Sequence, residues 1–461
     1  KKGQSEMFHS GTRFAIIGAG PGGLSAALAL RKKGYSNIQI FEKETTAGGK
    51  VNSYIYEGKP YELGAILLTA NFHEVKKIAD EFSIPMRNYH SPSLVDEDGK
   101  IYRFKDWTAA HFSKLELIKA TVRYVWLSSQ EKNQMQVGLE AVPDSLTLTM
   151  DKYICMHKLE PLSDPMEPMM VGLGYGYFKE IPAAYIMKLF SLLFWAKLRK
   201  ALTFGKTSLS TPVHGYQHLW QTVASSLAVH LNSPVEKIEK DGDCWKVKTA
   251  NGTKTFDQII LSVTPDISAN LLPEIPQLAR LAKEVRYYDY QVTVVKIDNF
   301  EREKTWYLRK NRQRDQLGQP IAITSPHPDA NVYMVYTQTD KTIHEDQILT
   351  NIKLAVQQMG GMVTEVLTHK KWRYFPHVSG NTIKSGFYQA WNDLQGKDGL
   401  WFTGGVFNFE TVEHTIQYSN HLVNNMMTQQ NHLNYSESKT LLLRKFSPSK
   451  SKDPVTHKIA K

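Results

Sequence analysis

The stretch FAIIGAGPGGLSAALAL, residues 14–30, decides the fold of this chain. It begins with a short apolar run, stops at a turn that contains four glycines, and continues in a segment rich in alanine and leucine. This order predicts a buried strand, a tight turn and a helix. A second apolar run, Ile38 to Phe41, ends at Glu42. Together the two runs and the helix between them predict a βαβ unit.

Three glycines of the turn each have a mechanical reason. Gly18 permits the tight turn, Gly20 lets the backbone approach a pyrophosphate, and Gly23 allows close packing of helix and strand. A phosphate then binds at the N-terminus of the helix, and Glu42 stands where a carboxylate accepts hydrogen bonds from ribose hydroxyls. The spacing predicts a dinucleotide-binding unit, and a purely structural glycine turn is the alternative.

A second pattern favours FAD over NAD as the dinucleotide. AGGK at residues 47–50 follows Glu42, and YELGAI stands at residues 61–66. This order resembles flavoproteins of the glutathione-reductase type that are related to amine oxidases and phytoene desaturases. The resemblance implies cofactor contacts at Gly49, Lys50, Gly64, Ala65 and Ile66. For Lys50, an ordinary surface lysine is the alternative.

Later parts of the same domain follow further along the chain. Residues 233–263 contain an Asp-Gly-Asp turn and an Asn-Gly turn between apolar runs, which predicts a three-stranded meander and a buried return strand. LWFTGG at residues 400–405 predicts a final strand that enters a glycine pair. A helix is expected to open at residues 410–413.

The resemblance gives three of these later residues a role. It implies that Val235 offers its backbone to the adenine side, that Gly404 belongs to the cofactor cradle, and that Val412 directs a helix N-terminus at the flavin pyrimidine. One departure stands out. Many relatives have an acidic residue where this chain has Gly405, so the carboxylate that usually meets the cofactor linkage is missing.

We therefore predict an α/β protein with a Rossmann-like FAD/NAD(P)-binding fold of the glutathione-reductase type and an inserted α+β substrate domain. The expected segments are 12–104, 204–265 and 385–432 for the FAD-binding domain, 105–203 for a helical insertion on the substrate side, 266–384 for the substrate domain and 433–461 for a basic, flexible tail. For that tail, a partner-binding arm is the alternative.

Three stretches carry a narrower resemblance. They are YELGAI at residues 61–66, GYGYF with IPAAY within residues 174–185, and WRYFPHVS at residues 372–379. Together they look like the bacterial polyunsaturated fatty acid isomerases, which make conjugated linoleate with FAD. The resemblance implies redox-neutral chemistry in which flavin N5 takes a hydride from an allylic carbon and returns it elsewhere. No catalytic side chain is predicted, because this chemistry needs no acid–base pair.

The resemblance also suggests residues for the substrate pocket. These candidates are Phe204 as an aromatic gate, Tyr374, Phe375 and Tyr388 as pocket wall, and Arg87 as a clamp for a carboxylate. The family's arginine falls near Ser91 and Pro92, so Arg87 is the nearby substitute, and a guanidinium suits a carboxylate because it makes two charge-assisted hydrogen bonds. For Phe204, an ordinary core phenylalanine is the alternative.

Composition limits the possible cofactors, partners and cellular location of the protein. The chain has 461 residues, a formal net charge of +11 and two cysteines, Cys155 and Cys244, without paired spacing. We expect no metal, no disulfide and no nucleic-acid partner, a cytoplasmic location, and FAD bound non-covalently, since neither cysteine lies in a flavin motif. No apolar run is free of charge over about 18 residues. The apolar stretch 189–195 predicts either peripheral contact with a membrane or a buried helix beside the active site.

The expected function is that of an FAD-dependent oxidoreductase or isomerase which acts by hydride transfer on an apolar molecule, such as an unsaturated fatty acid or related lipid. A flavin amine oxidase or desaturase with an external electron acceptor is the first alternative. A non-catalytic flavin-binding or membrane-associated scaffold is the second. The sequence leaves the substrate and the oligomeric state open.

Overall fold

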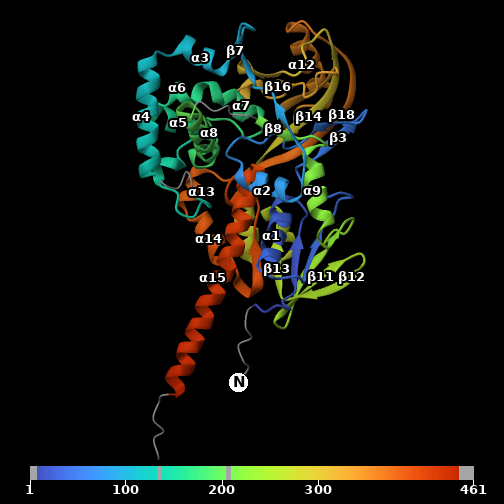
Figure 1. The fold of residues 1–461 in the computed structure, drawn as a ribbon, viewed down its shortest axis with the longest axis vertical. Coiled ribbons are helices and arrows are strands. Elements are labelled where there is room, and N and C mark those ends of the chain that lie inside the picture. Colours follow the sequence, from blue (N-terminus) through green and yellow to red (C-terminus); the bar gives the residue numbers. More distant parts are fainter. Residues whose placement is uncertain (1–7, 132–135, 204–208, 446–461) are drawn as a thin grey trace, which may run out of the picture.

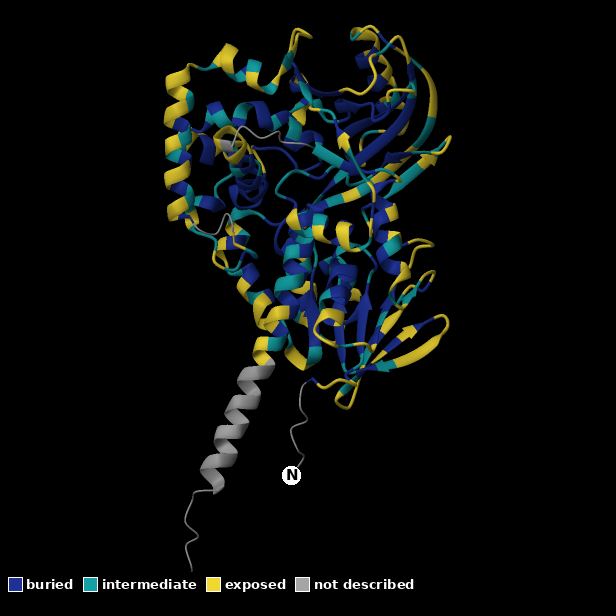
Figure 2. Cartoon of the chain, in the orientation of Figure 1, coloured by how far each residue is buried: buried dark blue, intermediate teal, exposed yellow. Residues whose placement is uncertain are grey.

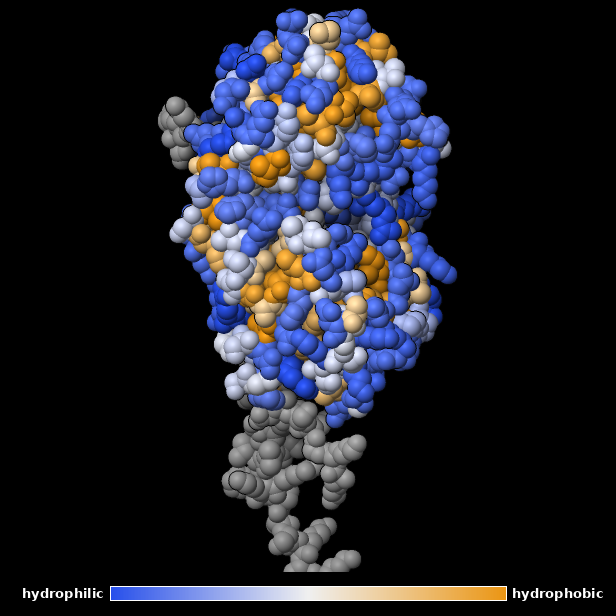
Figure 3. All heavy atoms as spheres, turned by 90° about the vertical axis from the view of Figure 1, so that its right-hand side faces the viewer, coloured by the Kyte–Doolittle hydropathy of each residue, from blue (hydrophilic) through white to orange (hydrophobic). Residues whose placement is uncertain are grey.

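The computed structural model describes residues 8–131, 136–203 and 209–445. Figure 1 shows two parts, with a parallel sheet in the lower half and a larger mixed sheet flanked by helices in the upper half. On the face shown in Figure 3, hydrophilic residues predominate and the apolar areas lie apart from one another. In the part of the chain that the structure describes, no helix combines the length and the apolar composition that crossing a bilayer requires.

The lower part is built on the parallel sheet that the glycine motif predicts. Its strands run in the order β19 (Leu400–Phe402), β13 (Gln258–Leu261), β1 (Phe14–Ile17), β2 (Ile38–Phe41) and β9 (Val229–His230). All its pairs are parallel, and β1 is buried along its whole length. A strand covered on both faces has no polar side, which explains its unbroken apolar run.

Helices cover this sheet, and a small sheet stands beside it. Helix α1 (Pro21–Lys32) follows the glycine turn and packs against α9 (Tyr216–Ser225) and α15 (Val412–Lys445). On α15 the Ser419 hydroxyl donates a hydrogen bond of 2.8 Å to the Gly22 carbonyl. The predicted meander is present as β10 (Lys237–Asp241), β11 (Cys244–Thr249) and β12 (Gly252–Phe256).

The upper part contains a seven-stranded sheet. Its order is β18 (Met362–His377), β14 (Arg286–Asp298), β17 (Val332–Thr339), β16 (Pro320–Thr324), β15 (Thr305–Leu308), β6 (Ser93–Val95) and β7 (Ile101–Arg103). Neighbouring strands are antiparallel except β15 and β6, which run parallel. The longest strands of this sheet are β14 and β18, which pair with each other and lie on the right of this part in Figure 1.

The helical insertion lies against this sheet, on the left in Figure 1. It contains α3 (Phe104–His111), α4 (Lys114–Gln130), η2 (Asp144–Thr147), α5 (Met150–His157), α6 (Glu160–Ser163), η3 (Asp164–Met166), α7 (Glu167–Gly172) and α8 (Ala183–Thr203). Figure 2 shows α4 as largely exposed, whereas α8 is buried in its N-terminal half and exposed toward its C-terminal end. The burial of Ala183 through Leu192 matches the expected buried helix beside the active site.

The remaining elements connect or flank the two parts. Strand pairs are β3 (Ser53–Tyr56) with β4 (Lys59–Glu62), and β5 (Met86–Tyr89) with β8 (Leu209–Pro212). The helices are α2 (His73–Glu81), α10 (Pro265–Leu271), α11 (Pro276–Glu284), α12 (Glu345–Gln358), α13 (Gly380–Lys384) and α14 (Phe387–Leu394). Short 3₁₀ turns are η4 (Arg309–Asn311), η5 (Arg314–Gln316), η6 (Lys397–Gly399) and η7 (Gly405–Phe407).

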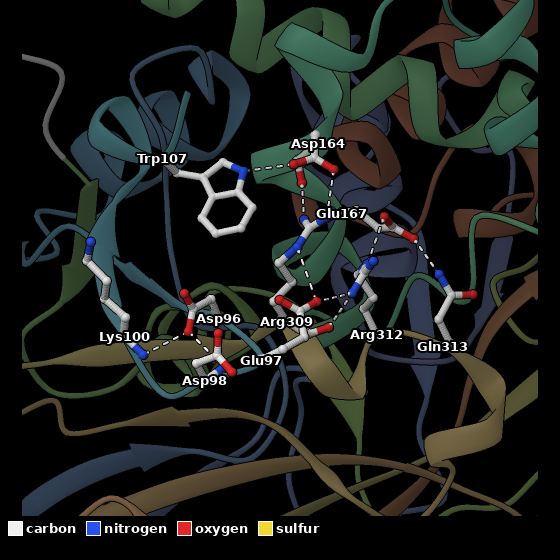
Figure 4. Close-up of polar contacts among 10 residues, drawn as sticks. All are labelled: Asp96, Glu97, Asp98, Lys100, Trp107, Asp164, Glu167, Arg309, Arg312 and Gln313. Carbon is white, nitrogen blue, oxygen red and sulfur yellow. Dashed lines mark hydrogen bonds and ion pairs between the residues drawn. The ribbon is translucent and has the colours of Figure 1, made fainter. Parts of the chain in front are cut away.

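A cluster of ion pairs fastens the helical insertion to the large sheet (Figure 4). Arg309 pairs with Asp164 at 2.8 Å, and Arg312 pairs with Glu97 at 3.0 Å and with Glu167 at 3.3 Å. These residues come from η4 and its C-terminal end, from η3 and α7, and from the loop between β6 and β7. The cluster therefore joins three segments that are far apart in the sequence.

The structure divides the chain differently from the sequence at two places. Strands β6 and β7, within the segment 12–104 that we expected in the FAD-binding domain, belong to the large sheet because β6 pairs with β15. Helix α15 continues to Lys445, into the segment 433–461 that we expected to be a flexible tail. The place of β6 and β7 has no local signal, since strand pairing depends on partners distant in the chain.

Candidate functional site

A cavity of about 540 Å³ opens at the carboxyl ends of the parallel strands. Ile17, Phe41, Ser262 and Gly404, which end or follow four of these strands, all line it. In open α/β sheets, ligands bind in the crevice outside the carboxyl ends of the strands. We call this space the cofactor cavity.

The glycine turn forms the floor of the cofactor cavity. Gly18 has a φ of +105°, which side chains rarely permit, and a Cβ there would lie 2.9 Å from the Ser262 carbonyl oxygen. At Gly23 a Cβ would overlap the Gly18 carbonyl. These backbone segments thus lie too close together for side chains. The N-terminus of α1 stays open to an anion such as a diphosphate.

Glu42 lies at the end of β2 with its side chain in the same cavity. The residue is buried, and one carboxylate oxygen accepts a hydrogen bond of 2.8 Å from the backbone N–H of Ala19, in the glycine turn. The other oxygen accepts one of 3.0 Å from the N–H of Glu44. Both bonds fix the carboxylate in place beside the turn, and the remaining lone pairs suit ribose hydroxyls.

Lys50 meets a carboxylate that sequence reasoning did not single out. Its Nζ lies 2.6 Å from Oε1 of Glu410, whose side chain is only 8% exposed, and 5.2 Å from the centre of the Tyr374 ring. The Glu410 carboxylate fills the space where a side chain at position 405 would begin. Position 405 must therefore be glycine for the Glu410 side chain to fit. A carboxylate does lie at this place, and it belongs to Glu410, five residues further along the chain.

A second, smaller cavity of about 130 Å³ adjoins the first. Its wall is apolar and aromatic, with leucines, Met169 and Phe72 beside a group of tyrosines. The residues that line both cavities are Ala65, Trp372, Tyr374, Glu410 and Val412. A molecule in this second space, which we call the substrate cavity, therefore lies directly beside whatever occupies that end of the cofactor cavity.

A few polar groups interrupt the apolar wall. His90 bonds through Nε2 to the Thr305 hydroxyl at 2.7 Å, and burial lowers the pKa of His90 to about 4, so the ring is neutral at neutral pH. The hydroxyls of Tyr216 and Thr69 are buried and meet no hydrogen-bond partner in the described residues. No lysine or arginine is among the described residues that line this cavity.

Most of the predicted cofactor residues come together. The cofactor cavity is lined by Gly18, Gly20, Glu42, Gly49, Lys50, Ala65, Val235, Gly404 and Val412. Gly64 and Ile66 line the substrate cavity instead, and Gly23 lies behind the turn in a packing position. Cys155 and Cys244 are not among the residues that line the cofactor cavity.

The predicted substrate residues are more scattered. Tyr374 lines both cavities. Phe375 and Tyr388 are buried just behind, with the Phe375 ring packed against Tyr175 at 5.7 Å between ring centres. Arg87 lies on β5, its guanidinium 5.7 Å from the centre of the Tyr89 ring, and it does not line the substrate cavity. Phe204 lies outside the described residues.

Glu410 and Gln217 are among the lining residues that the sequence did not reveal. Glu410 has a sequence signal, because it opens the segment before α15, but its contact with Lys50 joins residues 360 positions apart. Gln217 on α9 is buried in the cofactor cavity wall, where its amide nitrogen donates to the Ala47 carbonyl at 3.0 Å. Nothing in the local pattern distinguishes this glutamine from others on helices.

Comparison with known proteins fits this geometry. The model of the family described as flavin containing amine oxidoreductase matches residues 21–405. The chain belongs to this family. It is thus a flavin-dependent enzyme of the amine oxidoreductase superfamily, and membership implies FAD as its cofactor. The glycine turn, the helix N-terminus and Glu42 are the residues such a cofactor needs.

Among proteins of known function, a polyenoic fatty acid isomerase from Ptilota filicina is 21% identical over 482 residues, which cover 89% of this chain and 94% of the relative. A protoporphyrinogen oxidase from Arabidopsis thaliana is 36% identical over 75 residues, 16% of this chain and 15% of that protein. The first likeness spans nearly the whole chain, whereas the second is confined to a short segment.

Solved structures share the fold. The crystal structure of a CLA-producing fatty acid isomerase from P. acnes has a TM-score of 0.82 at 21% identity, and the match covers 91% of this chain and 99% of that one. Putrescine oxidase bound to putrescine has a TM-score of 0.65 at 15% identity, over 90% and 99% of the two chains. The α/β fold, with a parallel sheet and a mixed sheet beside it, is common to all three.

Proposed function

We propose that this member of the flavin containing amine oxidoreductase family isomerises a double bond in an unsaturated fatty acid or related lipid. The observation that carries the proposal is the apolar, aromatic substrate cavity that shares Ala65, Trp372 and Tyr374 with the cofactor cavity. The likeness to the polyenoic fatty acid isomerase over 89% of the chain supports it. The substrate would lie with an allylic carbon at this shared wall.

We further propose that FAD is bound non-covalently by the Rossmann-like unit of the glutathione-reductase type. The glycine turn and α1 would hold the diphosphate, Glu42 the ribose, and the N-terminus of α15 at Val412 the flavin end. When bound, FAD supplies a flavin N5 that accepts a hydride and returns it. The absence of either cysteine from the residues lining the cavity supports a non-covalent cofactor.

The protein residues position the substrate and exclude water. The wall of leucines and tyrosines would offer an acyl chain mostly apolar and aromatic contacts, which keeps water away from the reacting carbon. At the polar end of the substrate, the unpaired hydroxyls of Tyr216 and Thr69 would donate hydrogen bonds. A chain that enters this way is fixed at one end and lies along the shared wall.

The test is an anaerobic reaction of the flavin-loaded protein with linoleic acid. Ultraviolet absorption follows conjugated diene while the visible band follows the oxidised flavin. Isomerisation predicts diene formation with the flavin oxidised at the end, because the hydride returns to the substrate. Diene formation with a bound flavin supports the proposal, and no diene from linoleate or from its methyl ester contradicts it.

The same experiment separates an amine oxidase or desaturase. Family membership and the putrescine oxidase fold favour this second candidate. An amine oxidase predicts no change with linoleate but lasting bleaching of the flavin by an amine such as putrescine, followed in air by reoxidation and peroxide. A desaturase predicts lasting bleaching by the lipid without conjugated diene. The pairing of Glu410 with Lys50 at 2.6 Å argues against a cationic amine as the substrate, because it neutralises the carboxylate at the shared wall.

A further inference from the structure

Helix α4 carries an apolar stripe on its outer face. Leu115, Ile118, Val122 and Trp126 are 60%, 59%, 63% and 61% exposed. Their spacing of three, four and four residues puts them on one side of the helix, and Val125 borders them. We call these five residues the α4 stripe. Figures 1 and 2 show α4 at the outer edge of the molecule with exposed residues along its length.

The stripe is not the result of a loosely packed helix. The opposite side of α4 is buried through Ala120, Tyr124 and Leu127. The Tyr124 ring packs on Phe190 and Phe194 of α8, with ring centres 5.0 and 4.4 Å apart. The inner face of α4 is thus apolar and packs firmly against α8. The large side chains of the outer stripe are exposed to water and do not contribute to the hydrophobic core. A contiguous apolar surface of this kind marks an interaction site.

The charges beside the stripe indicate the partner. Lys114 and Lys119 are exposed at the edges of the stripe on α4. The only acidic residue within this helix is Glu116, and its carboxylate is committed to a capping box with Ser113. The whole chain carries a formal charge of +11. An apolar helix face with tryptophan and lysines at its borders fits an anionic lipid surface.

We propose that the α4 stripe docks on the surface of an anionic lipid bilayer, with Lys114 and Lys119 at the headgroups. Contact between two copies of this chain through the same stripe would bring lysine borders of equal charge together, so it fits less well. The inference goes beyond the proposed function and holds whichever reaction the flavin site performs.

Docking at this face would bring the substrate cavity close to lipid. Tyr124 of α4 donates a hydrogen bond to Ser191 of α8, and Leu189 and Leu193 of the same helix line the substrate cavity. Two helices, α4 and α8, therefore lie between the docked face and the substrate cavity. An apolar substrate dissolved in the bilayer would be concentrated beside the enzyme.

The test is sedimentation of the full chain, loaded with flavin, with vesicles of phosphatidylcholine alone or mixed with phosphatidylglycerol. The wild type should bind the mixed vesicles and bind less as salt rises. The triple variant Ile118→Ser/Val122→Ser/Trp126→Ser should reduce the partition coefficient about tenfold or more. Lys114→Gln/Lys119→Gln should reduce binding to the anionic vesicles about fivefold per lysine.

A matched control is Leu354→Ser/Met362→Ser, which removes two side chains that are 51% and 57% exposed elsewhere and should bind like the wild type. Unchanged thermal melting and flavin spectra show that the variants fold. Equal binding by the triple variant and the wild type would overturn the proposal. So would a wild-type dimer in solution that becomes monomeric in the triple variant, because the stripe would then be a protein interface.

Discussion

At the scale of single residues, the pair of Lys50 and Glu410 decides how the two cavities meet. Breaking a buried pair leaves one charge without its partner. Because Lys50 is 30% exposed, we expect Lys50→Met or Glu410→Gln to lower the free energy of unfolding by about 1–3 kcal/mol and to weaken FAD binding. The double variant should recover much of the loss. Denaturant unfolding and flavin fluorescence titration measure both effects, and additive losses would contradict a direct coupling.

A substitution at Tyr216 tests how the substrate cavity binds its ligand, because this residue lines the cavity. Its buried hydroxyl has no hydrogen-bond partner in the described residues, so Tyr216→Phe should not destabilise the fold. If the hydroxyl binds the polar end of the substrate, KM should rise about three- to tenfold. Tyr61→Phe is the matched control, since the Tyr61 hydroxyl is also buried and unpaired but lies outside that cavity. Equal KM values for both variants would remove Tyr216 from substrate binding.

Single residues whose roles depend on local spacing are the ones that the sequence predicts well. Gly18, Gly20 and Glu42 act through spacing within one βαβ unit, so a local pattern is enough to place them. The contact of Glu410 with Lys50 depends on how the end of the chain returns to its beginning. Arg87 illustrates the same limit, because its distance from the cavity wall follows from the pairing of β5 with β8, which no local pattern reveals.

At the scale of elements, a chain of tyrosine hydroxyls joins four segments behind the flavin site. The Tyr185 hydroxyl on α8 lies 2.5 Å from the Tyr388 hydroxyl on α14 and accepts from the Val378 N–H after β18. The Tyr388 hydroxyl donates to the Val406 carbonyl in η7 at 2.8 Å. The network fixes the substrate-side elements to the turn that lines the cofactor cavity.

Tyr388→Phe should therefore affect stability rather than substrate binding. Losing these hydrogen bonds in a buried place should cost about 1–2 kcal/mol, seen as a Tm lower by a few degrees. KM should stay unchanged because Tyr388 does not line the substrate cavity. The KM and Tm of this variant are compared with those of Tyr374→Phe, because the Tyr374 ring lines both cavities. A changed KM with an unchanged Tm in Tyr388→Phe would place this residue in the pocket wall after all.

At the scale of the whole molecule, two buried carboxyls make stability depend on pH. Burial raises the pKa of Glu62 to about 7 and, likewise, that of Glu413 to about 7, from an ordinary value of 4.5. The folded state thus holds protons that the unfolded chain has already lost, so stability falls as pH rises from about 4.5 to about 7. Each group contributes about 1–3 kcal/mol to this loss.

Thermal melting between about pH 5 and pH 8 checks this. Glu62→Gln keeps an amide oxygen for the Tyr216 N–H, which donates to Glu62 at 2.8 Å, and should flatten the decline. Glu57→Gln, at an exposed position, should leave the slope of the wild type unchanged. Wild-type stability that rises over this range would show that neither carboxyl holds its proton in the fold.

The fold class and the parallel sheet could be predicted because β1, α1 and β2 are consecutive in the chain. The large sheet could not be predicted in detail. Its edge strands β6 and β7 come from residues 93–103, before the helical insertion, and join β15 from a segment two hundred residues later. Ion pairs such as Arg309 with Asp164 then hold the insertion in place. Such long-range pairing leaves no periodic pattern at the places that it joins.

The position of β19 has a consequence for how the protein is made. This strand, Leu400–Phe402, pairs with β13 and closes one edge of the parallel sheet, yet the ribosome delivers it after most of the chain has emerged. Until then β13 presents an unpaired edge, which invites pairing with other chains. Flavin capture is thus expected only after Leu400–Phe402 have left the ribosome, and polypeptides cut short before residue 400 should be substrates for chaperones and proteases.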